Sequence, residues 1–510
     1  MSKTPSNKLF KLVKSLSASE KRYFKLYANN GIETARKYIQ LFDAIETQAT
    51  FDEAALKKTV YQDAPIESRK YSELKAYLYD MILKALQHYD EKSSLQFRLQ
   101  NRIQNINVLF KRGHYEECKD IIYKARKLAT KYEEFKVLLE LLAWEKKIAY
   151  TQSNIAFLEQ EFVRIHEHEQ QHLAQLRNIT NYQRIFFQIM VSIRKENLLR
   201  NPEQKLALQQ LLEDDLMSAI DRAQSYKASV LYLRIYGLYY YSILEYQKFY
   251  QTSEQLLELI RANPTLQRES TTEYISALSN YILSCGVLDK YKKVEAGLQE
   301  LRRVKTKTFD DERIIHFQYY SMSFSLCIAT GNFEQGLELL KSQQREQKKF
   351  EARLFESSSF YFSYFYIYFG VADYDKALAY LNEWLNLPRS VERQDLQSLA
   401  RILNLIIHYE MNNTLLLEYL LRSSYRYLRN RNRAHEIERQ VLGFLKDSLK
   451  IQGKKALKEA FIALKTSIEA VADQPSENAI LRYFNFMAWI DSKIEGKEFG
   501  MIIKRKKKLN

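Results

Sequence analysis

The hydrophobic and polar positions of this chain recur with helical spacing, and one arrangement of them repeats about every 41 residues. The stretches YYSMSFSLCIATGNFEQGLELL and FYFSYFYIYFGVADYDKALAYL align without a gap, which places Phe333 opposite Tyr374. One step upstream, Tyr291 lies 42 residues before Phe333, and Phe249 lies 42 residues before Tyr291. A fixed period of this length is typical of stacked supersecondary units.

Each unit predicts a helix, a short turn and a second helix. An apolar first helix ends in a turn that holds Gly, Asn or Asp, and an aromatic residue then opens the second helix. Because such a hairpin cannot bury both of its faces alone, it stacks on its neighbours and forms a solenoid. The spacing predicts turns at about 288–290, 330–332 and 371–373, with Phe333 and Tyr374 packed between the two helices of their units. The same pattern surrounds Tyr115, and weaker copies are placed near Phe157, Asn201 and Asn413.

The stretch FGVADYDKALAYLNEWLNLP resembles a tetratricopeptide repeat. Five of its residues fall near the aromatic, small, large, small and terminal-proline positions of that family: Tyr374, Ala377, Leu381, Trp384 and Pro388. The period here is longer than the family's 34 residues, so the resemblance, over roughly residues 97–430, is to the broader tetratricopeptide-like superfamily. It implies an all-α fold, a right-handed α-solenoid of antiparallel helix pairs, which binds an extended peptide or a partner helix and has no chemistry of its own.

The two ends of the chain lie outside the repeat. Ser17-Ala18-Ser19-Glu20 predicts a capping box at the start of a helix, and further helices are expected at about 33–47, 52–60 and 67–89. These helices either cap the first repeat or form a helix-turn-helix unit that reads DNA. We therefore expect an N-terminal helical domain, the repeats, a C-terminal helical cap and a basic tail, over residues 1–95, 96–430, 431–500 and 501–510.

Composition strengthens the all-helical prediction. The 510 residues include only 12 Gly and 6 Pro, which long helices exclude and which turns and strands use. Cys118, Cys285 and Cys327 lie far apart with no C-x-x-C spacing, as is typical of a reducing compartment. The N-terminus lacks the apolar core of a signal peptide, and the apolar run FYFSYFYIYFGV is too short to span a bilayer. We expect a cytoplasmic protein without membrane insertion.

The net charge of +16 is concentrated toward the C-terminus, where residues 422–510 hold 20 Lys and Arg against 10 Asp and Glu. A basic surface attracts nucleic acid, anionic lipid or an acidic protein. Tyr425 and Tyr427 could stack on bases while neighbouring arginines neutralise phosphates. Alternatively, these arginines serve the C-terminus of their helix and pair with Glu436 and Glu438. The candidate contact residues are Arg422, Arg426, Arg429, Arg431, Arg433, Lys504, Arg505, Lys506, Lys507 and Lys508.

One motif suggests metal chemistry: His168 and His172 belong to an H-E-x-x-H sequence, which binds zinc in many proteases. The following residues, HLAQLRNITNY, supply no third ligand of the usual pattern. The histidines are predicted at the edge of an apolar helix stripe, on the side that faces water. The stripe consists of Leu158, Phe162, Ile165, Leu173 and Leu176.

The search for other catalytic motifs finds no glycine-rich phosphate loop and no G-x-S-x-G sequence. We therefore expect no catalytic, cofactor-binding or metal-binding residue. The first hypothesis is a non-enzymatic scaffold for protein–protein interaction. The alternative is a nucleic-acid-associated regulator that uses the N-terminal helices or the basic C-terminal end.

Overall fold

A computed structural model of the chain consists of α-helices and short 3₁₀ helices joined by turns, and its described residues contain no strand. The prediction of an all-α protein is therefore confirmed. The structure describes residues 7–29, 35–61, 68–91, 94–153, 155–195, 202–306, 308–350, 358–387, 396–429 and 436–508, except 473, 475, 476, 478–480 and 482.

The first five helices form a unit with a hydrophobic core of its own. Ser17 and Glu20 make the predicted capping box: the Glu20 carboxylate accepts from the Ser17 backbone N–H at 2.6 Å, and the Ser17 hydroxyl accepts from the Glu20 N–H at 3.3 Å. The buried core lies between Leu9 and Ala85, and no described residue beyond this unit belongs to it. The helices are α1 (Lys8–Ser15), α2 (Ala18–Asn29), α3 (Ala35–Thr47), α4 (Glu53–Tyr61) and α5 (Ser68–Asp90). α1 was not predicted, whereas α3, α4 and α5 begin and end within two residues of the predicted positions.

A second group of helices joins this unit to the repeats. α9 is 41 residues long; its earlier part packs on α8, where Lys146 pairs with Glu169 at 2.6 Å. Its later part packs on α11 (Tyr226–Ser242), where the rings of Tyr182 and Tyr232 lie 6.4 Å apart. The group consists of α6 (Leu95–Phe110), α7 (Tyr115–Lys131), α8 (Phe135–Thr151), α9 (Ile155–Lys195) and α10 (Pro202–Leu212), followed by the short 3₁₀ helices η1 (Asp215–Met217) and η2 (Ile220–Arg222).

Five pairs of packed helices follow, each joined by a turn of two or three residues. The turns at 288–290, 331–332 and 371–373 lie where the repeat predicts them. A short helix, α13 (Pro264–Glu269), precedes the second pair. The pairs are α11 with α12 (Tyr246–Ala262), α14 (Thr271–Val287) with α15 (Tyr291–Arg303), α16 (Phe309–Thr330) with α17 (Phe333–Glu346), α18 (Ser358–Gly370) with α19 (Tyr374–Leu385), and α20 (Leu396–Glu410) with α21 (Thr414–Arg429).

These turns share one backbone geometry, which is the physical basis of the repeat. Two residues before each second helix, the chain adopts the left-handed conformation, and the next backbone N–H returns to the end of the first helix. In the α18–α19 turn, for example, Asp373 N donates to Tyr368 O at 3.0 Å, which satisfies a carbonyl that the helix end leaves free. The left-handed residues of the five pairs, with φ between 56° and 73°, are Leu244, Asp289, Gly331, Ala372 and Asn412.

The same geometry shows that the predicted register around Phe249 is wrong by three residues. α12 opens at Tyr246, which follows the left-handed Leu244 as Tyr291 follows Asp289. Phe249 lies one turn further into the helix, where it is buried. The sequence hides this turn because a leucine occupies the position that usually favours Gly or Asn.

The chain ends in helices that fold back onto the last repeats. α22 (Glu436–Ser448), α23 (Lys454–Glu469) and α25 (Phe486–Glu495) share the largest hydrophobic core with α18–α21. α26 (Phe499–Lys508) includes most of the predicted basic tail, which is helical here, with Ile502 and Ile503 buried.

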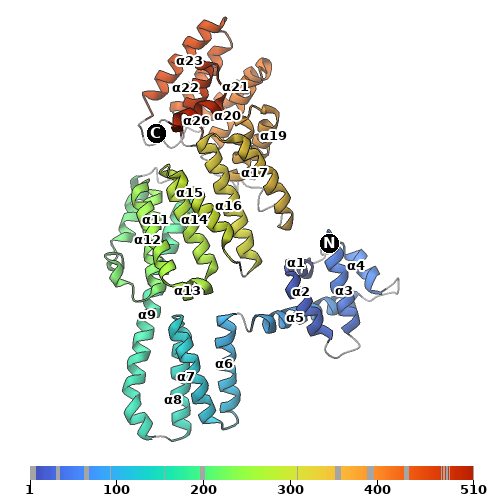
Figure 1. The fold of residues 1–510 in the computed structure, drawn as a ribbon, viewed down its shortest axis with the longest axis vertical. Helices are drawn as coiled ribbons and strands as arrows, with labels where there is room; N and C mark the ends of the chain where they lie inside the picture. The colour runs from blue at the N-terminus through green and yellow to red at the C-terminus, as the bar shows by residue number, and fades with distance from the viewer. Residues whose placement is uncertain are drawn as a thin grey trace.

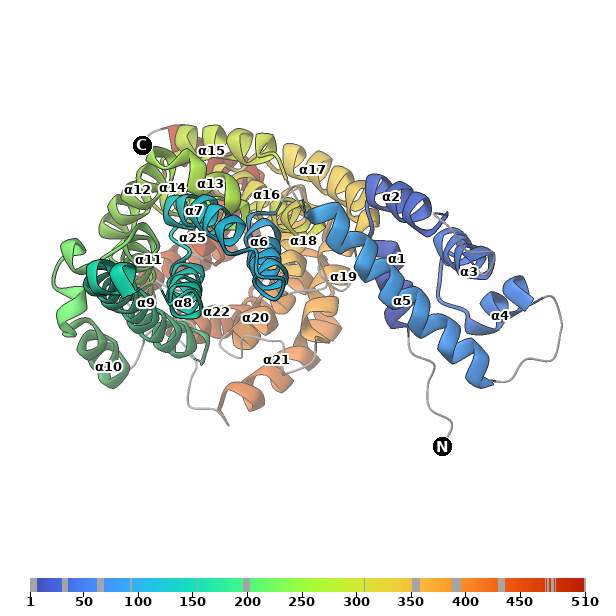
Figure 2. The same cartoon turned by 90° about the horizontal axis from the view of Figure 1, so that it is seen from below.

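The helices follow one another along the longest axis of the molecule, with the first unit to one side. The chain rises from α6–α9 at the lower end through α11–α16 to the C-terminal helices at the upper end (Figure 1). α1–α5 stand out to one side in both ribbon views (Figures 1 and 2). Among the described helices, none combines the length and the apolar character that a bilayer crossing requires.

Candidate protein-interaction surface

The aromatic face of α18 is covered by the C-terminal end of the chain. Phe499 of α26 stacks on Phe333 at 5.9 Å and approaches Tyr366 at 6.0 Å. The Tyr366 hydroxyl accepts from the backbone N–H of Asn485 at 3.1 Å, although 119 residues separate the two in sequence. This aromatic face is therefore occupied by the chain itself.

Glu410, at the end of α20, ties these C-terminal helices to the repeats. Its buried carboxylate accepts from Trp489 Nε1 at 2.7 Å and from the Tyr374 hydroxyl at 3.2 Å, and it pairs with Lys493. Two of these partners lie on α25 and one on α19, so a single carboxylate links three helices.

Most of the described cations of α26 are likewise paired within the chain. Lys504 lies 3.2 Å from Glu334, and Lys506 lies 2.6 Å from Asp491. Arg505 donates to Glu495 at 2.6 Å, and its hydrogen bonds lower the pKa of that carboxyl to about 2. These pairs reduce the positive field that the sequence suggests. Lys507 and Lys508 lie in the helix, but their side chains fall outside the described residues.

α21 presents the other candidate cations, and it combines them with exposed apolar side chains. Arg422 and Arg426 are exposed, and Arg422 pairs with Glu418 at 2.8 Å. Arg429 ends the helix with its side chain outside the described residues, where Arg431 and Arg433 also lie.

The exposed apolar side chains of α21 come from one hydrophobic run. Leu417, Leu421 and Ser424 form its buried stripe, while Leu415 is 88% exposed and Tyr419 is 70% exposed. Leu416 and Tyr425 add to this surface. The sequence TLLLEYLL already indicated this exposure. The buried stripe of a helix takes three or four apolar residues in two turns, and this run contains more than that. We call Leu415, Leu416, Tyr419, Arg422, Tyr425 and Arg426 the α21 face.

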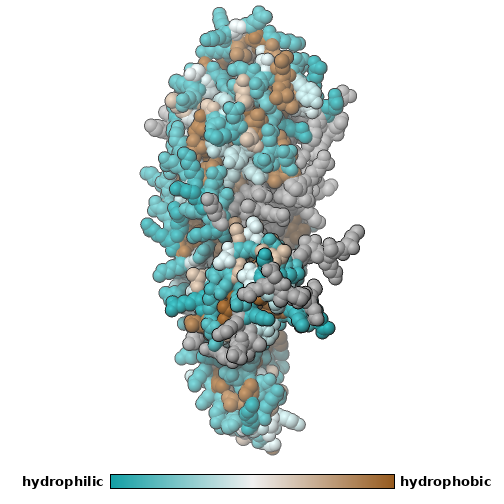
Figure 3. Space-filling view, turned by 90° about the vertical axis from the view of Figure 1, so that its right-hand side faces the viewer, coloured by the Kyte–Doolittle hydropathy of each residue, from teal (hydrophilic) through white to brown (hydrophobic). Residues whose placement is uncertain are grey.

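The position of the α21 face agrees with an interaction surface. In the view from below, α21 lies at the margin of the molecule, away from α1–α5 (Figure 2). At the upper end, where the C-terminal helices lie, hydrophobic residues reach the surface among hydrophilic ones (Figure 3). Leucine and tyrosine side chains beside arginines provide the apolar area and the charge that protein interfaces use.

The predicted water-facing position of the H-E-x-x-H histidines is wrong. His168 and His172 are half-buried on the side of α9 that faces α8, where the His172 ring lies 5.9 Å from that of Phe135. Phe162 and Leu173, which the prediction placed inside, are 53% and 47% exposed. The stripe was misassigned because α8 packs against a partly polar face. Burial lowers the pKa of His168, and the described residues hold no cluster of three side chains suited to a metal.

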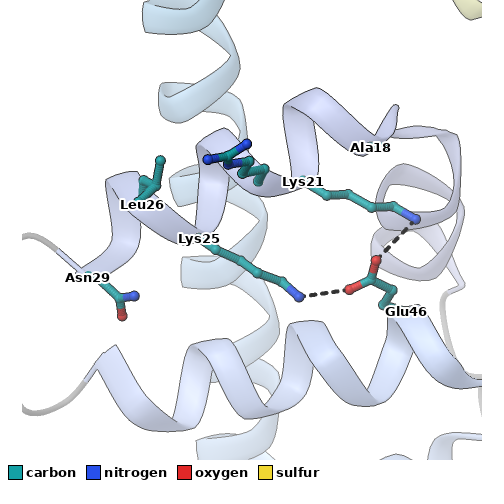
Figure 4. A pocket seen from close by; sticks show the side chains of 7 residues that line it. Ala18, Lys21, Lys25, Leu26, Asn29 and Glu46 are labelled. Atoms are coloured by element: carbon teal, nitrogen blue, oxygen red, sulfur yellow. Dashed lines mark hydrogen bonds and ion pairs between the residues drawn. The ribbon is translucent and has the colours of Figure 1, made fainter.

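An open hollow with charged lining lies on the N-terminal unit (Figure 4). Two of its three cations are paired with carboxylates: Lys25 lies 2.8 Å from Asp43 and 2.9 Å from Glu46, and Lys21 lies 3.5 Å from Glu46. Hydrogen bonds to these carboxylates raise the pKa of Lys25, so it remains a paired ammonium group and not a base. The lining residues are Ala18, Lys21, Arg22, Lys25, Leu26, Asn29 and Glu46.

Comparisons with protein-family models, with curated proteins and with solved structures find no match to this chain. Its function is therefore inferred from its own surfaces.

Proposed function

We propose that this chain is a non-enzymatic helical-repeat scaffold that binds a protein partner through the α21 face. The observation that carries the proposal is the exposure of Leu415 and Tyr419 beside Arg422 and Arg426 on a well-packed helix. Exposed apolar groups that gather beside charges mark interaction sites. The partner that fits is an amphipathic segment with apolar side chains for Leu415 and Tyr419 and a carboxylate for Arg426, since Arg422 already pairs with Glu418.

The recurring left-handed turn supports the finer architecture that we propose, a right-handed tetratricopeptide-like solenoid of antiparallel pairs. Such arrays present long surfaces for binding other proteins. The three cysteines are buried thiols, which agrees with action in the cytoplasm. The internal ion pairs of Lys504, Arg505 and Lys25 favour a protein partner over nucleic acid, because neutralised cations release few counterions from phosphates.

The test is affinity capture from native lysate with the immobilised full chain, with and without nuclease. We expect a retained protein that resists nuclease and is lost from the double variant Leu415→Ser with Tyr419→Ser. The matched control, Tyr123→Ser on α7, removes an equally exposed aromatic (68%) and should retain the partner. Retention that nuclease abolishes would favour the regulator hypothesis, and equal retention by the α21 variant would place the site elsewhere.

A further inference from the structure

α9 exposes a row of apolar side chains that lie near one line along the helix. Ile155 is 66% exposed, Phe162 53%, Leu173 47%, Phe187 62% and Val191 52%. At about 100° per residue, these five positions stay within about 40° of one line along the helix. The row runs for 36 residues, about 54 Å at 1.5 Å per residue. We call these five residues the α9 stripe.

A row of this length is more than the scattered apolar exposure that any soluble protein shows. The row runs along the axis of a helix with 3.6 residues per turn and does not wind around it. A single partner helix could therefore contact it along its length. In Figure 1, α9 forms the outer edge of the lower part of the molecule, with α8 on its other side.

The distribution of charges along α9 indicates which partner fits the α9 stripe. The first half, residues 155–172, has four Glu and one Arg, and the second half, residues 173–195, has four cations and no carboxylate. The helix dipole favours carboxylates at the start of a helix and cations at its end, but only within the first and last turns. Glu167 and Arg177 are exposed near the middle of α9, so the dipole does not account for them. A parallel copy would face like charges, and an antiparallel copy would face opposite ones.

We propose that α9 pairs with α9 of a second copy of this chain, antiparallel about a two-fold axis at Leu173. In this register Leu173 meets its own copy, and Ile155 meets Val191. Phe162 meets Arg184, which also pairs with Asp214 at 2.9 Å, in an arrangement that suits a cation over an aromatic ring. Phe187 meets Glu159, so the match rests on the apolar contacts of Leu173, Ile155 and Val191 and on the opposite charges of the two halves of α9, which a two-fold axis brings together. The pairing goes beyond the proposed partner binding and uses a different helix.

The first test is cross-linking at single introduced cysteines in the full chain. The native Cys118, Cys285 and Cys327 are at most 2% exposed, so they contribute little background. With a short bismaleimide, Leu173→Cys should give a covalent dimer, because the two thiols meet at the axis. Phe162→Cys should give no covalent dimer, since the equivalent thiol on the other copy lies about 33 Å away along the helix. Dimers from both variants would indicate a parallel pairing and overturn the proposal.

The second test is the oligomeric state by light scattering across a concentration series. Wild type should form dimers, and Leu173→Asp should raise the dimer dissociation constant by at least about tenfold, because two carboxylates would meet at the axis. The matched control Leu26→Asp, at a 59% exposed position on α2, should leave the constant unchanged. A wild-type chain that stays monomeric at all concentrations would refute the pairing and leave the stripe to another protein.

Discussion

Replacing Gly370 with alanine tests the packing of α17, α18 and α26 most directly. A Cβ at Gly370 would lie 2.2 Å from Cγ of Phe333. That ring cannot retreat easily, because it is 1% exposed and stacks between Tyr366 at 6.1 Å and Phe499 at 5.9 Å. Overpacking costs about 1–3 kcal/mol, whereas Gly to Ala in a helix gains at most about 1 kcal/mol. We expect Gly370→Ala to destabilise this region by about 1–2 kcal/mol.

The effect should reverse when the ring of Phe333 is removed. Phe333→Ala alone should cost about 3–5 kcal/mol, the usual penalty for emptying the space of a buried aromatic ring. In that background the added methyl group at position 370 enters vacated space. Gly370→Ala should then be neutral or stabilising by up to about 1 kcal/mol. The double-mutant cycle should therefore give a coupling energy of roughly 2 kcal/mol.

Hydrogen exchange is the suitable assay, because a helical chain of this length need not unfold in one step. The free energy of local opening is measured for peptides from α17, α18 and α26. Peptides from α6–α8 serve as the internal control and should not change. If Gly370→Ala has the same effect with and without the ring of Phe333, the two residues are not in contact and the reasoning fails.

Two further predictions concern α9 and the turns. Replacing His168 and His172 with alanine should lower the free energy of unfolding by roughly 1 kcal/mol in a thermal melt, because both are half-buried against α8. Surface sites would lose only a few tenths. Elemental analysis should find no stoichiometric zinc, and one tightly held zinc per chain would contradict this prediction. Ala372→Gly should stabilise the α18–α19 turn by roughly 0.5 kcal/mol, because exposed Ala372 has φ 60° and glycine relieves that conformation. Asn412→Gly should gain less because Asn tolerates it, and equal gains would refute the argument.

The helices and turns could be predicted from the sequence because their causes are local. The capping box at Ser17 and Glu20 and the turn before Tyr374 each depend on a few neighbouring residues. The prediction failed at Leu244, where the chain accepts a left-handed leucine that no composition rule favours.

The candidate surfaces were harder to predict because they depend on contacts between distant residues. Lys504 is neutralised by Glu334, 170 positions away, so a basic tail in the sequence becomes a paired helix in the fold. Phe162 and Leu173 of α9, which are exposed, were interpreted as part of its core face for a similar reason. Which face a helix buries is decided by its neighbours, here α8 and α11, and both faces of α9 carry apolar residues.

The α9 stripe and the α21 face have a joint consequence for binding. A two-fold pairing through α9 places two α21 faces on one particle, so a partner with two binding segments would engage both at a high effective concentration. The chain would then bind a dimeric partner far more tightly than a single peptide, without any new contact. Leu173→Asp should remove this gain while leaving the affinity for a single peptide unchanged, whereas changes at Leu415 and Tyr419 should weaken both. Equal losses for both ligands in the Leu173 variant would mean that α9 contributes to binding by another route.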